Sequence, residues 1–176
     1  MGRLEVEVKV RVHGDPHDVG VKLRSIGFNK VAEEQQVDIY FSHPCYDLAS
    51  RDEALRLRIV GGKAILCFKG PRLPGPLKSR KEIEVEVSNA EECLELLSSL
   101  GFKELAKVIK RRRIFERRGV KVCVDSVEGL GHFLEVEADN PEDVLEVLKV
   151  LGYDVSDVVR ETYLEMILSS KKSSNS

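Results

Sequence analysis

Paired glutamates recur three times in this chain, each time in a short stretch that alternates carboxylates with aliphatic residues. The stretches are Leu4–Glu7, Ile83–Glu86 and Leu134–Glu137. In a β-strand, successive side chains point to opposite faces, so both glutamates of a pair share one face. Carboxylates gathered from several strands can hold divalent ions, and Mg²⁺ and Mn²⁺ favour such oxygen ligands. The pairs therefore predict a metal-binding face on a β-sheet.

Basic residues follow the same alternation on other predicted strands. Arg56 and Arg58 share one face, and so do Lys110 and Arg112. Arginine offers forked contacts to phosphate oxygens, and lysine offers a point charge. On any single strand, a charged face is more simply the solvated side of an antiparallel sheet. The recurrence on nearly every strand, opposite aliphatic faces, instead favours a shared site for a polyphosphate.

Composition narrows the classes of partner. The chain has 176 residues, of which 42% are hydrophobic and 33% charged, and its net charge is −2. That length suits one domain or two small fused halves with a real core. No strong overall field draws in nucleic acid or an anionic membrane, and no apolar run reaches membrane-spanning length. We expect a cytoplasmic protein with no nucleic-acid or membrane partner.

Neither the cysteines nor the histidines show a metal-binding spacing. The four cysteines lie far apart, without a C-x-x-C pair, which favours neither a zinc site nor a disulfide framework. The histidines have no regular spacing, and surface or loop roles suit them better. These residues are Cys45, Cys67, Cys93 and Cys123, and His13, His17, His43 and His132.

Alternation and turn signals divide the chain into eight strands and four helices. Gly61-Gly62 marks a hairpin between two of the strands. Proline and glycine make residues 70–79 an irregular loop, and the tail 171–176 is predicted to be disordered. The predicted strands are 4–12, 30–41, 54–60, 63–69, 80–88, 104–116, 120–127 and 133–138. The predicted helices are 15–26, 90–99, 140–151 and 155–168.

These elements predict an α+β fold with its charges on one face of the sheet. The helices carry apolar stripes, which need the aliphatic faces of the strands for cover. The charged faces must then point away from the helices. They could coat an open sheet, or the eight strands could close into a barrel with the charges inside, which would remove the edge strands.

An ordered series of short motifs runs along nearly the whole chain. The motifs are Glu5-x-Glu7-x-Lys9, Gln36-x-Asp38-x-Tyr40-Phe41, Leu55-Arg56-Leu57-Arg58, Phe68-Lys69-Gly70-Pro71, Arg80-x-Glu82-x-Glu84, Lys110-x-Arg112-x-x-Phe115, Asp125 with Gly129-Leu130-Gly131, Glu135-x-Glu137 and Arg160-x-x-Tyr163. The first motif resembles the ExExK signature of the CYTH superfamily, the triphosphate tunnel metalloenzymes. The ordered series resembles that superfamily as a whole and is most similar to its archaeal class IV adenylate cyclase-like branch.

The resemblance implies a single domain over residues 1–170. Its fold would be an eight-stranded antiparallel β-barrel tunnel with a charged interior and helices packed outside. The implied metal ligands for Mg²⁺ or Mn²⁺ are Glu5, Glu7, Glu135 and Glu137, supported by Glu84 and Asp125. The implied triphosphate contacts are Arg56, Arg58, Lys69, Arg80, Lys110 and Arg112. Lys9 would lie beside the reacting phosphate, where it acts with Glu5 and Glu7 in catalysis.

The implied activity has two forms that use the same residues. In the first, ATP is converted to cyclic AMP and pyrophosphate by a class IV adenylate cyclase. In the alternative, an inorganic or organic triphosphate, such as thiamine triphosphate, is hydrolysed. A third reading is a polyphosphate or nucleotide binder without turnover, and the presence of all four glutamates ranks it last. The resemblance leaves a homodimer open.

Overall fold

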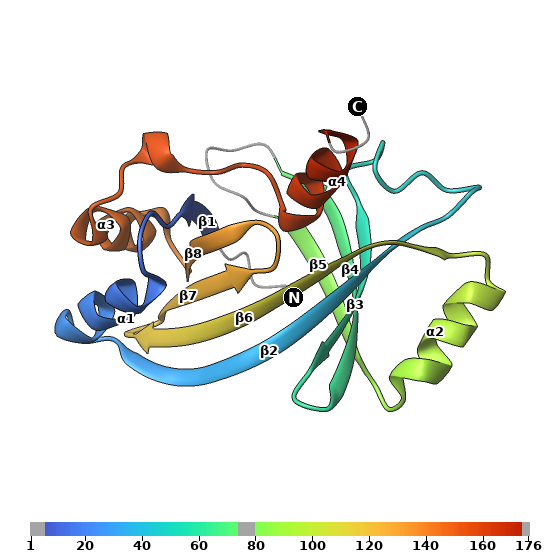
Figure 1. The fold of residues 1–176 in the computed structure, drawn as a ribbon, viewed down its shortest axis with the longest axis horizontal. Helices are drawn as coiled ribbons and strands as arrows, with labels where there is room; N and C mark the ends of the chain where they lie inside the picture. The colour runs from blue at the N-terminus through green and yellow to red at the C-terminus, as the bar shows by residue number, and fades with distance from the viewer. Residues whose placement is uncertain (1–5, 74–79, 174–176) are drawn as a thin grey trace.

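The computed structural model describes residues 6–73 and 80–173, which form one eight-stranded antiparallel sheet and its helices. The strand order is β1-β8-β7-β6-β2-β3-β4-β5, so β1 and β5 lie at its two edges. The sheet curls into a half-barrel, in which the long strands β2 and β6 run side by side across the middle (Figure 1). The elements are β1 (Val6–Arg11), α1 (Pro16–Ser25), β2 (Asn29–Ser42), β3 (Ala54–Val60), β4 (Lys63–Arg72), β5 (Arg80–Val87), α2 (Ala90–Ser99), β6 (Lys103–Arg117), β7 (Val120–Val127), β8 (Gly131–Ala138), α3 (Pro141–Leu151), the 3-10 helix η1 (Val155–Asp157) and α4 (Tyr163–Ser173).

This architecture confirms the predicted α+β fold with eight antiparallel strands. Three parts of the sequence predictions lie outside the described residues. They are Glu5, most of the irregular loop (residues 74–79) and the end of the tail (residues 174–176). In the ranges that the structure describes, no helix is long and apolar enough to cross a membrane.

The helix starts follow directly from local sequence. Asp15 caps α1 by accepting a hydrogen bond from the backbone N–H of His17, and Asn89 caps α2 in the same way. Asn140 accepts from the backbone N–H of Asp143 at the start of α3. Such caps satisfy backbone donors that have no partner within the helix.

Two consecutive glycines make the β3–β4 hairpin. Gly61 and Gly62 have φ values of 55° and 78°, the left-handed region that a two-residue type I′ turn requires. The turn places Val60 opposite Lys63 and thereby sets the register of the hairpin. Arg56 consequently lies opposite Cys67, which is a pairing within the candidate site.

Three of the helices cover the convex face of the sheet. The apolar residues of α1 and α3 join the outward aliphatic residues of β1, β7 and β8 in one core, which includes Leu23, Val124, Leu134 and Leu148. Helix α2 packs at the other end, against outward residues of β2, β3 and β4, with Leu97 in contact range of that cluster. The two ends are well separated in Figure 1. This arrangement confirms that the aliphatic faces serve the helices, which leaves the concave face for the charges.

The last helix takes a different place from the other three. Tyr163 and Met166 of α4 pack with Tyr40, Val108 and Phe133. Alternation places those three residues on the same face as the charged residues, because Asp38, Lys110 and Glu135 lie two positions away on the same strands. Helix α4 therefore covers part of the concave face, rather than packing outside the sheet.

The C-terminal region also differs from the sequence prediction in its boundaries. Residues 155–168 are not one helix, because only Val155–Asp157 and then Tyr163–Ser173 are helical. Thr162 and Glu165 form a reciprocal capping pair, at 2.6 and 3.2 Å, which starts α4. The helix continues through Ser173, beyond the predicted start of the disordered tail. Strand β4 similarly extends to Arg72, into the predicted loop.

Candidate functional site

The concave face collects the predicted site residues that fall in the described ranges. Several of them are register partners, or face one, on neighbouring strands. Lys9 lies opposite Glu135, Arg112 opposite Asp125, and Arg56 opposite Cys67. The predicted residues on this face are Glu7, Lys9, Arg56, Arg58, Lys69, Arg80, Glu84, Lys110, Arg112, Asp125, Glu135 and Glu137. The predicted ligand Glu5 lies outside the described residues.

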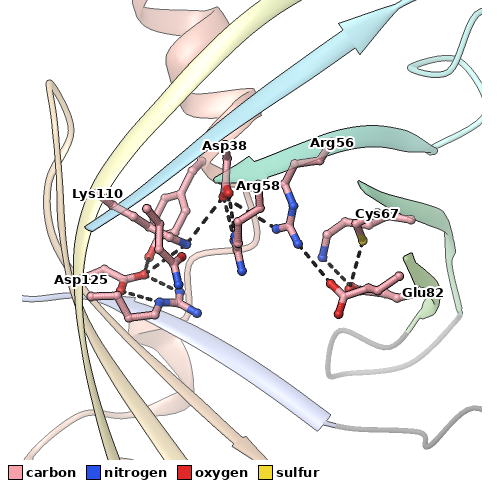
Figure 2. Close-up of polar contacts among 12 residues, drawn as sticks. Asp38, Arg56, Arg58, Cys67, Glu82, Lys110 and Asp125 are labelled. Carbon is pink, nitrogen blue, oxygen red and sulfur yellow. Dashed lines mark hydrogen bonds and ion pairs between the residues drawn. The ribbon is translucent and has the colours of Figure 1, made fainter. Parts of the chain in front are cut away.

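The face has two parts, which we call the α4 wall (β1, β8, β7 and β6) and the β5 wall (β3, β4 and β5). Strand β2 lies between them. Polar contacts cross from one wall to the other through Asp38 of β2 (Figure 2). The charged residues thus form one connected surface across the curl of the sheet.

Asp38 joins the cations of the two walls. Its carboxylate accepts two hydrogen bonds from Arg58, at 2.6 and 2.7 Å, and lies 3.7 Å from Arg56 and 4.0 Å from Lys110. Burial acts to raise the pKa of Asp38, which is 1% exposed. The hydrogen bond from Arg58 and the charges of Arg56, Arg58 and Lys110 outweigh burial and hold that pKa at about 2. Asp38 therefore remains ionised and fixes three cations.

Asp125 performs the same task on the α4 wall. Arg112 donates to both of its oxygens, at 2.8 and 2.6 Å, and the Tyr163 hydroxyl donates to one of them at 2.9 Å. Lys110 lies 3.7 Å away, and Asp125 itself is fully buried. Arg112 also pairs with Glu135. The bidentate geometry is the strongest form of arginine–carboxylate contact, so Arg112 is held in one orientation.

Lys9 is the most enclosed cation of β1. It donates to the backbone carbonyl of Glu161, and its ammonium lies 4.3 Å from the centre of the Tyr163 ring. Burial lowers the pKa of Lys9, although the neighbouring charges of Glu135 and Glu7 raise it. The pKa of Glu135 is well below its usual range. Burial acts to raise it, but Arg112, Lys110 and Lys9 outweigh that effect. Lys9 and Glu135 thus form the charged centre of the β1–β8 pair.

Glutamates line the β1–β8 pair beyond Lys9. Glu7 and Glu137 are register partners, so their side chains leave adjacent backbones on the same face. Lys121 of β7 lies 2.5 Å from Glu137 and offsets part of the negative charge. Glu7, Glu135 and Glu137 therefore offer oxygen ligands within two neighbouring strands, which is a donor set suited to Mg²⁺ or Mn²⁺.

The β5 wall is more open. Glu82 lies 2.5 Å from Lys69, and Glu84 lies 3.4 Å from Arg56. The side chains of these two glutamates are 37% and 52% exposed. Arg80 donates to the carbonyl of Gly70 at 3.4 Å, next to the predicted loop. Lys69 and Arg80 thus stand at the rim of the concave face, rather than in its buried centre.

Sequence reasoning assigned no role to four residues that organise this face. They are Asp38, Cys67, Glu82 and Tyr163, and all but Cys67 lie within the motifs that resemble the CYTH superfamily. The alternation of β2 could have identified Asp38, since it shares a face with Gln36 and Tyr40 on a strand beside the arginine pair. No local signal places Tyr163 against Asp125, because that contact depends on how α4 packs.

Comparisons with known proteins identify relatives over nearly the whole chain. The CYTH domain matches residues 3–163. A Methanocaldococcus jannaschii protein, provisionally named an adenylate cyclase, is 35% identical over 172 residues, which cover 93% of this chain and 98% of the relative.

Solved structures show the same fold. The PH1819 protein of Pyrococcus horikoshii matches with a TM-score of 0.82 and 38% identity, covering 94% of this chain and 99% of that one. A Hippeastrum protein, provisionally named an adenylyl cyclase and described as having a dominant triphosphatase activity, matches with a TM-score of 0.73. It is 20% identical, and the match covers 94% of this chain and 96% of that one.

Proposed function

The chain belongs to the CYTH domain family, and we propose that it is a metal-dependent enzyme that acts on a triphosphate bound to the concave face. The first candidate activity is the conversion of ATP to cyclic AMP and pyrophosphate, in line with the name of its archaeal relative. The second is hydrolysis of a triphosphate, which the description of the Hippeastrum protein favours.

The observation that carries this proposal is the surplus of positive charge at the centre of the concave face. There the cations Lys9, Arg56, Arg58, Lys110 and Arg112 surround the largely buried carboxylates Asp38, Asp125 and Glu135. Burying cations in excess of carboxylates is costly unless an anion compensates them. A triphosphate supplies several negative oxygens along a line, which suits a row of cations.

The glutamates of β1 and β8, on the α4 wall, suit the divalent metal ion that such a substrate requires. Glu7, Glu135 and Glu137 would hold Mg²⁺ or Mn²⁺, with Asp125 in support through its hold on Arg112 and Glu84 in support from the β5 wall. A divalent cation bound there would neutralise phosphate oxygens and polarise the reacting oxygen. The assignment rests on the donor set, because hard oxygen ligands on adjacent strands match these ions.

The other residues would bind and orient the phosphate chain. Arg58 and Arg112 are fixed by bidentate carboxylates, so their remaining N–H groups are pre-oriented for phosphate oxygens. Lys9 lies beside Glu7 and Glu135, which suits its ammonium to stabilise the charge that develops on the reacting phosphate, while the proton of the attacking oxygen is released to solvent. Lys69 and Arg80, at the rim, would contact the outer end of the chain.

In the cyclase reaction, the 3′-hydroxyl of ATP attacks the α-phosphorus. The new bond forms between the 3′-oxygen and that phosphorus, and the bridging bond to the β-phosphate breaks to release pyrophosphate. In the hydrolase reaction, water attacks the terminal phosphorus instead. The same cations serve both reactions, so the orientation of the bound triphosphate decides between them.

One assay separates the candidates. The purified full chain would be incubated with ATP, and separately with inorganic triphosphate, in Mg²⁺ or Mn²⁺, and the products separated by chromatography. Cyclic AMP with pyrophosphate from ATP supports the cyclase, whereas orthophosphate together with ADP from ATP, or together with pyrophosphate from inorganic triphosphate, supports the triphosphatase. Glu137→Gln should abolish either reaction while the fold remains intact, because it removes a proposed metal ligand. No turnover of either substrate with either metal would overturn the proposal.

A further inference from the structure

A second group of metal-ligating atoms lies on the β5 wall. Cys67, Glu82 and Glu84 place one sulfur and two carboxylate oxygens within 4.8 Å of one another. Cys67 of β4 is the register partner of Glu84, and Glu82 follows on the same face of β5. The Cys67 sulfur is fully buried and lies 3.8 Å from a Glu82 oxygen (Figure 2). Strand register therefore places the three side chains next to one another on one face of the sheet.

Arg56 gives independent evidence that a ligand belongs beside this group. It is 5% exposed, lies opposite Cys67 in the β3–β4 pair, and reaches toward Glu84 at 3.4 Å. Its Nε has no hydrogen-bond partner, although the atom is buried. A buried donor without a partner is uncommon in proteins and calls for an acceptor. An oxygen ligand carried on a cation bound by Cys67, Glu82 and Glu84 would provide that acceptor.

The present partners of the two glutamates are displaceable. Glu82 pairs with Lys69 and Glu84 with Arg56, and both carboxylates are partly open to solvent. Glu84 is 52% exposed and Arg56 keeps its contact with Asp38, so a divalent cation can compete for these oxygens. Such a cation would release the ammonium of Lys69 and part of the Arg56 guanidinium from their carboxylates.

We propose that Cys67, Glu82 and Glu84 form a second divalent-cation site, selective for borderline-soft ions such as Zn²⁺ or Co²⁺ over Mg²⁺. As the sulfur–metal bond forms, the Cys67 thiol gives its proton to solvent. Sulfur prefers softer ions, whereas Mg²⁺ demands oxygen ligands and retains waters. Three protein ligands leave a coordination position open for water or a phosphate oxygen, as in catalytic rather than structural sites.

The site has a consequence that rests on the proposed function. A cation there frees Lys69 and Arg56 and adds its own charge, so it should tighten triphosphate binding. Linkage requires that triphosphate tighten cation binding by the same factor. The β5 wall would then respond to the supply of a thiophilic metal.

Cobalt spectroscopy tests the site without any substrate. Only a sulfur ligand gives an intense thiolate-to-Co²⁺ charge-transfer band, so Co²⁺ bound by Glu7, Glu135 and Glu137 does not interfere. The full chain would carry Cys45→Ser, which removes the exposed thiol. We expect a saturable band that excess Mg²⁺ does not suppress. Cys67→Ala should abolish it, and Glu82→Gln or Glu84→Gln should weaken Co²⁺ binding tenfold or more.

Two variants serve as matched controls. Cys93→Ala removes a buried thiol of α2, and Cys123→Ala removes one on the concave face opposite Glu135. Both should retain the band with unchanged affinity. Cys67→Ser guards against loss of fold, because it keeps the side-chain volume and should also lack the band. No band in the parent protein, or a band that survives Cys67→Ala, would overturn the site.

The link to triphosphate is measured separately. Titration of inorganic triphosphate with and without saturating Zn²⁺ should show at least threefold tighter binding with the metal, and no change in Cys67→Ala. A cobalt band without this coupling would support the metal site but refute its link to the substrate. Failure of the proposed function would appear instead as absent turnover with Mg²⁺ or Mn²⁺, whatever the cobalt result.

Discussion

The two walls of the concave face carry similar charges but hold them in different ways. On the α4 wall, Arg112 and Lys110 are buried and share Asp125, which Tyr163 also contacts. On the β5 wall, Glu82 and Glu84 are partly exposed and pair with single cations. Strand β5 is also a sheet edge, and its outward residues Ile83 and Val85 are about half exposed.

The difference shows that one sheet can combine a fixed region with an adaptable one. Carboxylates with several buried partners cannot move without leaving a charge unpaired. Surface pairs at the edge can exchange partners at little cost. We infer that the α4 wall defines the position of the reacting phosphate, and that the β5 wall adjusts to the ligand.

The sharpest test of this contrast is stability. Asp125→Ala should lower the free energy of unfolding by about 3–5 kcal/mol, because it removes the fully buried carboxylate that Arg112 and Lys110 share. Glu84→Ala, on the other wall, should change it by less than about 1 kcal/mol, since Glu84 is 52% exposed and Arg56 keeps its contact with Asp38. Urea denaturation of the two variants measures both. Equal losses would remove the distinction between the walls.

Acid should weaken the buried network between the walls. The pKa of Asp38 is about 2 in the fold, against an ordinary value of 3.8, so the folded state binds its proton more weakly than the unfolded state. Its contribution of about 2 kcal/mol is present above the unfolded pKa and is lost as pH falls through the folded value. The measurement is the free energy of unfolding from about pH 5 to pH 2.

Asp38→Asn provides the reference for that titration. Asparagine does not titrate, so the variant should lose less stability across this range than the parent, although it starts less stable. Parallel pH profiles would show that Asp38 is not the responsible group.

A substitution at the rim of the concave face should weaken triphosphate binding without unfolding the protein. Lys69→Ala should weaken binding of inorganic triphosphate by about 1–2 kcal/mol, the size of one partly exposed charged contact. The free energy of unfolding should change little. Lys63→Ala is the matched control, because Lys63 forms an equally simple pair with Glu86 but stands 64% exposed at the hairpin. Calorimetry that finds the same affinity in both variants would argue against Lys69 as a contact.

The smallest expected effect concerns the link between α4 and its wall. Tyr163→Phe removes one hydroxyl from Asp125 and keeps the ring against Lys9 and Phe133. We expect a loss of about 1 kcal/mol in unfolding free energy, since Asp125 retains both hydrogen bonds from Arg112. Thermal unfolding compared with Tyr153→Phe, at the end of α3, isolates the effect of this contact. A larger loss than that of Asp125→Ala would reverse the assigned roles.

Periodicity predicted which residues share the concave face. The period of two in Glu135-x-Glu137 and Arg56-x-Arg58 fixes their common side whatever the pairing, and the caps at Asp15 and Asn140 fix where helices begin. Periodicity did not predict which strands would be neighbours in the sheet. That Asp38 lies beside Arg58 follows from the order β6-β2-β3, which depends on long-range pairing.

The C-terminal region shows the other limit of sequence reasoning. Tyr163 and Met166 make an apolar stripe like those of the other helices, and a stripe does not state which face of a sheet it covers. The start of α4, by contrast, could have been predicted from the sequence, because Thr162-x-x-Glu165 is a capping-box pattern. The contacts of Tyr163 were missed because they depend on packing. The start of α4 depends on local sequence and could have been predicted.

The contact between Lys9 and Glu161 joins residues that are 152 positions apart in the chain. Tyr163 and Glu165 are synthesised long after β1, yet they enclose its central cation. A nascent chain that has produced every strand still lacks the segment that covers the α4 wall. We therefore expect the proposed affinity for triphosphate to appear only after α4 has been synthesised.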